Sequence, residues 1–187
     1  MASVRRKGDA IRVELKPEEA ALLRVLVGEV LRLLDPGPAE TGADPLEELT
    51  GMSSQPVESP TDPALQRLLP DAYAEDDVAA REFRRLTDSD LRGAKREALQ
   101  HIVDSLATGQ PTRSGASRFV LDQASAAAWL PALTDVRLVV ASRLGIEEDI
   151  DLERMAVDPD TARFDEIALY DWLSYLQEAL VHAVAGD

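Results

Sequence analysis

Apolar side chains recur every three to four residues along residues 129–146, WLPALTDVRLVVASRLGI. On a helix with 3.6 residues per turn, this spacing produces one broad apolar stripe. The stripe comprises Ala126, Trp129, Leu130, Leu133, Val136, Val140 and Leu144. Leu138, Val139 and Ala141 add apolar surface on other faces. We therefore expect other segments to cover this helix on most sides.

The N-terminal residues predict a β-hairpin followed by a helix. Residues 3–6 and 10–15 flank Lys7-Gly8-Asp9, where glycine can adopt the positive φ of a tight turn. Residues 10–15 also alternate apolar and polar side chains, as a strand with one buried face does. A helix then runs from Pro17 to Leu34 and is apolar over more than half of its circumference. It is either central to the fold or half of a dimer interface.

Four more helices follow from the pattern. A short helix is predicted over residues 64–69 and a longer one over residues 75–86. The sequence TDSD at residues 87–90 resembles a capping box, which predicts that a separate helix starts there and ends at residue 107. The last helix spans residues 164–184. We expect a mainly α protein, a helical bundle of about five helices with an N-terminal β-hairpin.

Residues 118–121 are a candidate third strand beside the hairpin. This strand and the helix after it echo the N-terminal strand and helix at a separation of 106 residues, so that Leu15 matches Leu121. Either two amphipathic segments match by chance, or the core is pseudo-symmetric and its two long helices pack together. Pro131 raises a second question, because an interior proline removes a helical hydrogen bond. The helix either begins there or, as we favour, kinks there.

Two segments interrupt the helical pattern. Residues 35–61 hold five prolines and three glycines, and residues 35–80 hold eleven acids against one arginine. This composition predicts a flexible, acidic, proline-rich linker over residues 35–61. Residues 109–116 predict a second loop. The total length suits a single domain over residues 1–187 that contains both segments.

The chain is strongly acidic and lacks cysteine. Its formal net charge of −15 repels phosphate backbones, which disfavours direct DNA binding. No segment approaches about 18 uninterrupted apolar residues, so we expect a cytoplasmic protein without a membrane contact. With no cysteine in the sequence, disulfides, thiolate metal sites and thiol-based redox sensing are excluded within this chain.

One basic cluster, within residues 81–96, is the candidate partner-binding site. Its proposed contact residues are Arg84, Arg85, Arg92 and Arg96. The predicted helix, turn and helix resemble a helix-turn-helix, which would favour DNA. Residues 81–107, however, hold six bases and five acids. Salt bridges within the molecule or to a protein partner are the alternative.

No catalytic set or cofactor motif stands out, and we expect neither enzyme activity nor a cofactor. The two histidines, His101 and His182, each follow a glutamate by four residues, Glu97 and Glu178. Two such pairs could hold a metal across a bundle. A plain surface pair one helical turn apart explains the same spacing without a metal.

The apolar stripes also predict the core. Its expected members are Leu23, Val27, Trp129, Leu133, Val136, Val140, Leu173, Leu176 and Leu180. Arg137 lies beside the stripe of the Trp129 helix and is expected to be buried with them. Because an unpaired buried charge is costly, Arg137 needs a partner, and an acid on the first or last helix, such as Glu29 or Asp171, could serve.

Five stretches combine these features in distinctive ways. They are RRKGDAIRVELKPEE at residues 5–19, LLPDAY at 68–73, EFRRLTDSDLR at 82–92, WLPALTDVRLVVASRLG at 129–145 and YDWLSYLQEALV at 170–181. Together they resemble an actinobacterial family, domain of unknown function 2017, also described as oxidative-stress regulator AosR-like. The resemblance implies a non-enzymatic regulator that works with an alternative sigma factor and RNA polymerase and senses redox state through cysteines.

Because this chain has no cysteine, the thiol switch does not carry over. We therefore expect a regulatory protein that acts by protein–protein interaction, with a sigma factor or RNA polymerase as its partner. A dimeric scaffold and a metal-binding helical bundle that uses Glu97, His101, Glu178 and His182 are the alternatives.

Overall fold

The computed structural model of the chain describes residues 2–35, 58–73, 76–146 and 161–186, so most of the predicted linker lies outside the described residues. In chain order the elements are β1 (Ser3–Lys7), β2 (Ala10–Leu15), α1 (Pro17–Leu33), α3 (Pro63–Leu68), α4 (Asp77–Ala107), β3 (Gln110–Pro111), β4 (Ser117–Leu121), α5 (Gln123–Leu144) and α7 (Thr161–Ala185). The prediction of a mainly α fold with an N-terminal hairpin is confirmed.

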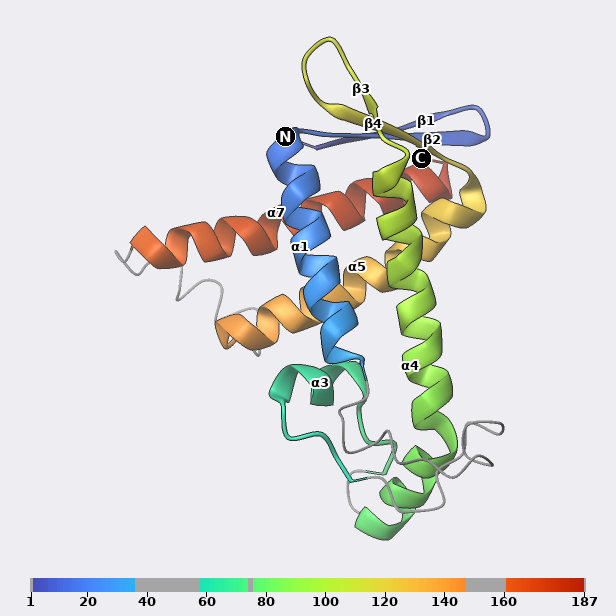
Figure 1. The fold of residues 1–187 in the computed structure, drawn as a ribbon, viewed down its shortest axis with the longest axis vertical. Coiled ribbons are helices and arrows are strands. Elements are labelled where there is room, and N and C mark those ends of the chain that lie inside the picture. Colours follow the sequence, from blue (N-terminus) through green and yellow to red (C-terminus); the bar gives the residue numbers. More distant parts are fainter. Residues whose placement is uncertain (1, 36–57, 74–75, 147–160, 187) are drawn as a thin grey trace.

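The four described strands form one antiparallel sheet in the order β1-β2-β4-β3. The sheet lies across one end of the molecule, and the described helices all lie on one side of it (Figure 1). Gly8, with φ of +63°, forms the tight turn of the first hairpin. The third strand is confirmed as β4, which pairs with β2. The segment predicted as a second loop contains β3, whose two residues are too short to show any alternation.

β2 and β4 each open a strand–helix unit, and the two units are related. Val13 of β2 pairs with Phe119 of β4, and α1 and α5 begin at Pro17 and Gln123. Both pairs have the separation of 106 residues seen in the sequence. Antiparallel pairing of equivalent residues places an approximate twofold axis between Val13 and Phe119. The sequence echo thus corresponds to a repeated local structure, in which α1 and α5 contact each other.

α5 is the central helix, since it contacts every other described helix and both inner strands. It is continuous from Gln123, so the alternative start at Pro131 is wrong. Pro131 has no N–H group to donate to the carbonyl oxygen of Ala127. Both residues are exposed, so this carbonyl group lies near solvent. By length and composition alone α5 could also cross a membrane, but half of that stretch is buried inside this fold. It is the core helix that the sequence predicted.

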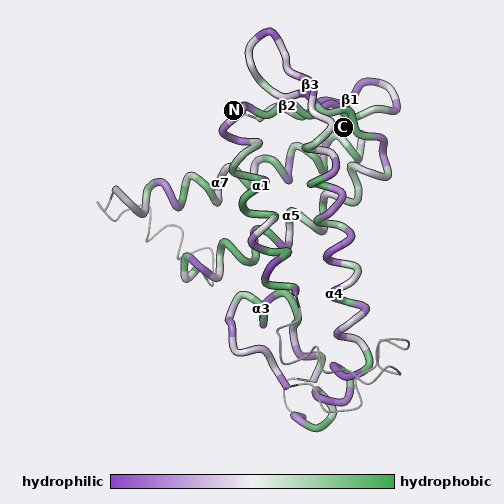
Figure 2. The backbone as a smooth tube through the Cα atoms, viewed as in Figure 1, coloured by the Kyte–Doolittle hydropathy of each residue, from purple (hydrophilic) through white to green (hydrophobic). Residues whose placement is uncertain are grey.

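The side chains predicted to form the core all lie inside the molecule. Leu23, Val27, Trp129, Leu133, Val136, Val140, Leu173, Leu176 and Leu180 are each at most 7% exposed. The inner face of the sheet adds Ile11, Val13, Leu15, Phe119 and Leu121 to the same cluster. Figure 2 shows the resulting pattern, with hydrophobic residues along α1 and α5 and a hydrophilic tip on the β3–β4 hairpin.

α4 corrects one prediction. It is a single helix of 31 residues, with no boundary at Thr87. The Thr87 hydroxyl donates to the carbonyl oxygen of Phe83 at 2.9 Å, as threonine does inside helices. Asp88 pairs with Arg92 four residues later, with 2.5 Å between Oδ2 and Nε. These side chains mimic a capping box in the sequence, but no turn separates the two halves of the basic cluster. The helix-turn-helix outline is therefore wrong.

Candidate partner-binding surface

The four arginines predicted to bind a partner are engaged within the molecule. Arg84 is only 6% exposed, pairs with Asp71 and donates a hydrogen bond to Ser59 at 3.1 Å. This network joins α4 to the segments on both sides of α3. Arg85 pairs with Glu82 at 2.8 Å.

Arg92 and Arg96 both reach the C-terminal end of α1. Each directs Nη1 toward the carbonyl oxygen of Leu34, at 3.4 Å and 3.5 Å, and Arg96 also pairs with Asp35. Positive charge at a helix C-terminus complements the helix dipole. The geometry thus gives these two arginines a role in joining α4 to α1, and a partner would have to compete with these contacts.

Replacing Arg84 by alanine is expected to lower the free energy of unfolding by about 2 kcal/mol, because buried hydrogen bonds to a charged group are lost. Hydrogen bonds from Ser59 and Arg84 lower the pKa of Asp71. A carboxyl group with a lowered pKa stabilises the fold above its ordinary range and loses that contribution as the pH falls. Urea unfolding should show the difference from wild type at pH 7 and a smaller one at acidic pH. Arg81→Ala, an exposed position of α4, is the control, and an equal loss there would refute the assignment.

Arg137 is half-buried, but the expected acidic partner is not present among the described residues. Its Nη1 donates to Oε1 of Gln177 at 2.9 Å, and its Nη2 donates to the hydroxyl of Tyr170 at 3.1 Å. The guanidinium carbon also lies 5.1 Å from the centroid of the Tyr170 ring. The predicted pairing with Glu29 or Asp171 is therefore wrong. Neutral acceptors and an aromatic ring take the place of a carboxylate.

The two Glu–His pairs do not come together. His101 on α4 and His182 on α7 are both exposed, and His182 lies 3.9 Å from Glu178 on its own helix. Among the described residues, no group of three or more histidine, aspartate and glutamate side chains is arranged to hold a metal ion. Each pair therefore has the geometry of a surface pair one helical turn apart.

A buried ion pair, which the sequence reading missed, connects α4 to α5. Asp135 is 4% exposed, and its Oδ1 lies 2.6 Å from Nζ of Lys95. Burial raises the pKa of Asp135, while the hydrogen bond and charge of Lys95 oppose the rise. The signal was present in the sequence as an aspartate next to the apolar stripe, but the partner lies 40 residues earlier.

The outer face of the sheet gathers several basic side chains from different strands. We call it the basic sheet face and define it by the outward side chains of the strands and one arginine of the β3–β4 loop: Ser3, Arg5, Lys7, Arg12, Glu14, Arg113, Arg118 and Val120. The inward residues of the same strands pack on the helices. Five cations and one acid on this face contrast with the net charge of −15 for the chain.

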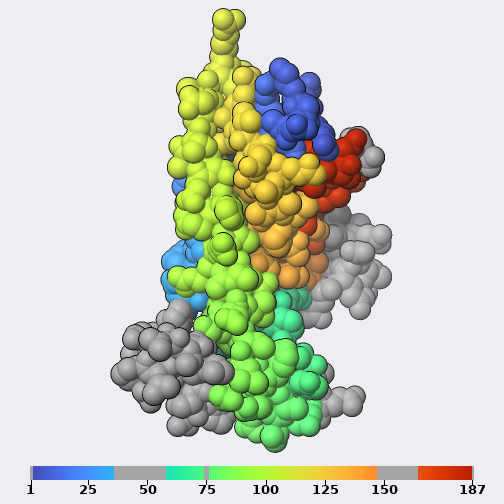
Figure 3. Space-filling view, turned by 90° about the vertical axis from the view of Figure 1, so that its right-hand side faces the viewer, coloured from blue at the N-terminus to red at the C-terminus, as the bar shows by residue number. Residues whose placement is uncertain are grey.

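Two shallow hollows lie side by side on the basic sheet face. The first, of about 320 Å³, is lined by Ser3, Arg5, Arg6, Lys7, Arg12 and Glu14. The second, of about 510 Å³, is lined by Glu14, Pro111, Thr112, Arg113, Ser114 and Arg118. Glu14 borders both, and we refer to the two hollows together as the trough. Figure 3 shows the β3–β4 hairpin projecting beyond the rest of the molecule at this end.

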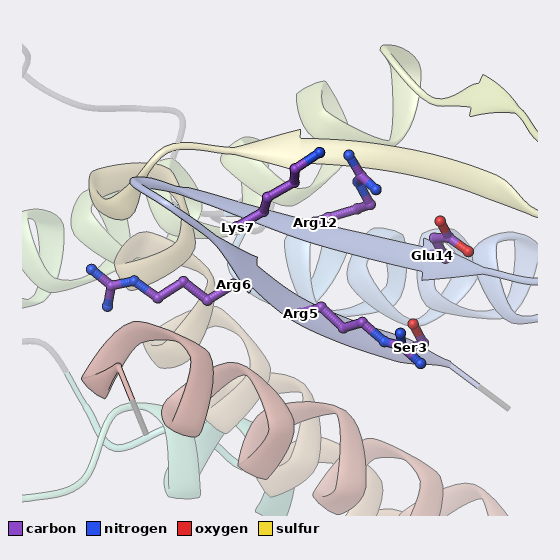
Figure 4. Close-up of a pocket in the computed structure, with 6 residues that line it drawn as sticks. All are labelled: Ser3, Arg5, Arg6, Lys7, Arg12 and Glu14. Carbon is purple, nitrogen blue, oxygen red and sulfur yellow. The ribbon is translucent and has the colours of Figure 1, made fainter.

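The side chains along the trough have different partners. In Figure 4, Lys7, Arg12 and Glu14 project to the same side of the strands, whereas Arg6 points away from Arg12. Arg6 instead directs Nη1 toward the carbonyl oxygen of Val184 at 3.3 Å, at the C-terminal end of α7. Glu14 accepts from Nε of Arg118 at 2.7 Å. Arg6 therefore joins the hairpin to α7, whereas Arg5, Lys7 and Arg113 are exposed and Arg12 is half-buried.

The sequence carried a signal for this face that the prediction did not use. In the hairpin, Arg5 and Lys7 occupy alternate positions, and Arg12 has the same relation to Glu14. Residues two apart in a strand point to the same side. The strand alternation was used to predict the buried side, and the same alternation places the charged residues together on the other side.

Comparison with known proteins relates the whole chain to one family. A family model described as "Domain of unknown function (DUF2017)" matches residues 1–184. The chain belongs to this family. Relatives of this DUF2017 protein include the "Oxidative stress regulator AosR" of Mycobacterium tuberculosis and of Mycobacterium bovis, each 34% identical over 195 residues, or 97% of this chain and 85% of the relative.

A Mycobacterium leprae relative that also carries the AosR name is 36% identical over 190 residues, or 95% of this chain and 83% of the relative. No solved structure matches the DUF2017 chain significantly. The family predicted from the sequence motifs is therefore confirmed, and the names of the relatives support a regulatory role for this protein.

Proposed function

We propose that this protein is a non-enzymatic regulator of the oxidative-stress response that works by binding a protein of the transcription apparatus, a sigma factor or RNA polymerase. The observation that carries this proposal is the basic sheet face, an uncovered cationic surface on an acidic member of a family whose named relatives are oxidative stress regulators. It acts in the cytoplasm, where transcription takes place.

Several features support binding to a protein over direct contact with DNA. The net charge of −15 opposes approach to a duplex. The four arginines of α4 that were the candidate contact residues are held in ion pairs or at the end of α1. The chain also has no cysteine, so its own binding is constitutive with respect to thiol oxidation.

Capture experiments with purified components test this proposal. The full chain, immobilised through a tag, is incubated with RNA polymerase core enzyme, with holoenzyme and with isolated sigma factors from the same organism. We expect retention of a sigma factor or the polymerase, equally strong whether the immobilised chain has been treated with peroxide or with reductant. Retention of neither a sigma factor nor the polymerase would refute the proposal.

A further inference from the structure

We propose that the basic sheet face is a docking site for an acidic, extended segment of a protein, and that Arg5, Lys7, Arg12 and Arg113 provide its cationic contacts. This inference deepens the proposed function, because it names the chemistry of the partner at the surface on which that function rests. It rests on three observations: these four cations have no ion-pair partners among the described residues, they repel one another, and the face contains no aromatic side chain.

Four of the five cations of this face have no ion-pair partner among the described residues, whereas Arg118 pairs with Glu14. On α4, Arg84, Arg85 and Arg92 each have a carboxylate partner. On the sheet, Arg5 and Lys7 form no ion pair or side-chain hydrogen bond with any described residue. The same holds for Arg12 and Arg113 among the described residues. The face therefore presents four positive charges that the other described residues leave without anions.

The arrangement of these charges is unfavourable for the isolated protein. Arg5 and Arg12 lie directly opposite each other on β1 and β2. Like charges at opposed positions of a sheet destabilise it. Nε of Arg12 is in addition buried without a hydrogen-bond partner. An anion between the two guanidinium groups would remove the repulsion, and a carboxylate matches their planar donors in pairs.

The composition of the face favours an acidic protein segment over nucleic acid. Single-stranded nucleic acid is bound on sheet surfaces by aromatic side chains on which its bases stack. The outward residues here include no aromatic side chain, and the apolar one is Val120, which is 65% exposed. Glu14 lies in the middle of the trough and would repel a continuous row of phosphates. An acidic segment can place a hydrogen-bonding or apolar residue there instead.

A peptide titration tests the chemistry of the site. The probe is a fluorescein-labelled eight-residue peptide of alternating glutamate and valine, titrated with the full chain and followed by fluorescence anisotropy. Comparison probes are the same peptide with lysine for glutamate and a labelled 20-nucleotide single-stranded DNA. We expect saturable binding of the acidic peptide that weakens with salt, and none of the lysine peptide. Tighter binding of the DNA than of the acidic peptide would overturn the inference in favour of nucleic acid.

Matched variants locate the binding on the molecule. Arg5→Thr/Arg12→Thr removes two positive charges from the face, and Arg24→Gln/Arg81→Gln removes two from exposed positions of α1 and α4. We expect the first pair to weaken peptide binding about tenfold or more, the equivalent of one charge-assisted contact, and the second to change it less than about threefold. The melting temperature of the first pair should equal or exceed that of wild type, because like-charge repulsion is relieved. Equal weakening by both pairs would mean that only net charge matters, and would refute the site.

A variant that is expected to bind more tightly tests the site without relying on a loss of binding, which misfolding could also cause. Glu14→Gln removes the acid from the trough and frees Arg118 from its ion pair. Affinity for the acidic peptide should rise about threefold or more, since one repulsion is removed and one cation is released. An unchanged or lower affinity would show that the peptide does not lie in the trough.

The same variants distinguish this inference from the proposed function. If wild type and Arg5→Thr/Arg12→Thr capture RNA polymerase or a sigma factor equally well, the function stands and the docking site is wrong. If the acidic peptide binds and responds to the variants while neither transcription protein is captured, the docking site stands and the named partner is wrong.

Discussion

Replacing Trp129 by alanine is expected to lower the free energy of unfolding by about 3 to 5 kcal/mol, the range for truncating a buried tryptophan or phenylalanine. Trp129 is fully buried on the central helix, and its indole Nε1 donates to Oγ of Ser105 at 3.2 Å. A cavity in this place would remove contacts from several helices at once, because α5 touches all of them. Such a loss is a large fraction of the ~5 to 15 kcal/mol typical of a domain.

Chemical denaturation of three variants separates the parts of this effect. Ser105→Ala removes the hydrogen-bond acceptor and should cost about 1 kcal/mol. Val25→Ala, at a position 65% exposed, should change stability by less than about 0.5 kcal/mol. A loss below about 1 kcal/mol for Trp129→Ala would contradict the central place of this side chain in the core.

The second large effect is expected at the buried ion pair. Lys95→Met leaves the carboxylate of Asp135 in the core without its partner, and breaking a buried pair in this way costs about 3 to 5 kcal/mol. The double variant Lys95→Met/Asp135→Leu should recover most of this loss, because apolar residues of similar volume often replace a buried pair without cost. If the double variant is no more stable than Lys95→Met, the loss does not come from an unpaired charge.

The pH dependence of Lys95→Met provides an independent check. Burial raises the pKa of Asp135 above its ordinary 3.8, so its contribution favours folding below that value and is lost as the pH rises through the folded-state pKa. Without Lys95 the pKa should rise further, which moves the loss toward neutral pH. Lys95→Met should thus be less destabilised at pH 5 than at pH 7. Adding Asp135→Asn to this variant should remove the difference in stability between pH 5 and pH 7.

The fold was largely predictable because its determinants are local. The hairpin follows from strand alternation around Gly8, and α5 follows from a stripe of apolar residues that begins before Trp129. The two failures have different origins, one in an ambiguous local signal and one in a pairing between strands. Thr87 suggested a helix start although a threonine inside a helix can bond to its own preceding turn, and β3 consists of two residues that gain their partner only when β4 lies beside them.

The candidate site was harder to predict because ion pairing depends on contacts between residues that are distant in the sequence. Arg84 and Arg5 both lie in basic stretches, and the sequence alone does not distinguish their environments. In the structure, Arg84 is buried against Asp71, while Arg5 is exposed and faces another arginine across the sheet. Sequence analysis identified the cluster with the higher local density of arginine. In the structure, the cluster on the sheet is the one in which most charges lack counterions among the described residues.

The order of the strands in the sheet also affects folding during synthesis. β2 obtains its second neighbour from β4, which lies about 100 residues later in the chain. At roughly 5 to 20 residues per second, the ribosome delivers β4 about 5 to 20 s after β2. A two-stranded hairpin is at best marginally stable alone, and its apolar face of Ile11, Val13 and Leu15 must wait for α5 as well. The nascent chain therefore carries a hairpin whose apolar face is only partly covered, by α1, for a large part of its own translation.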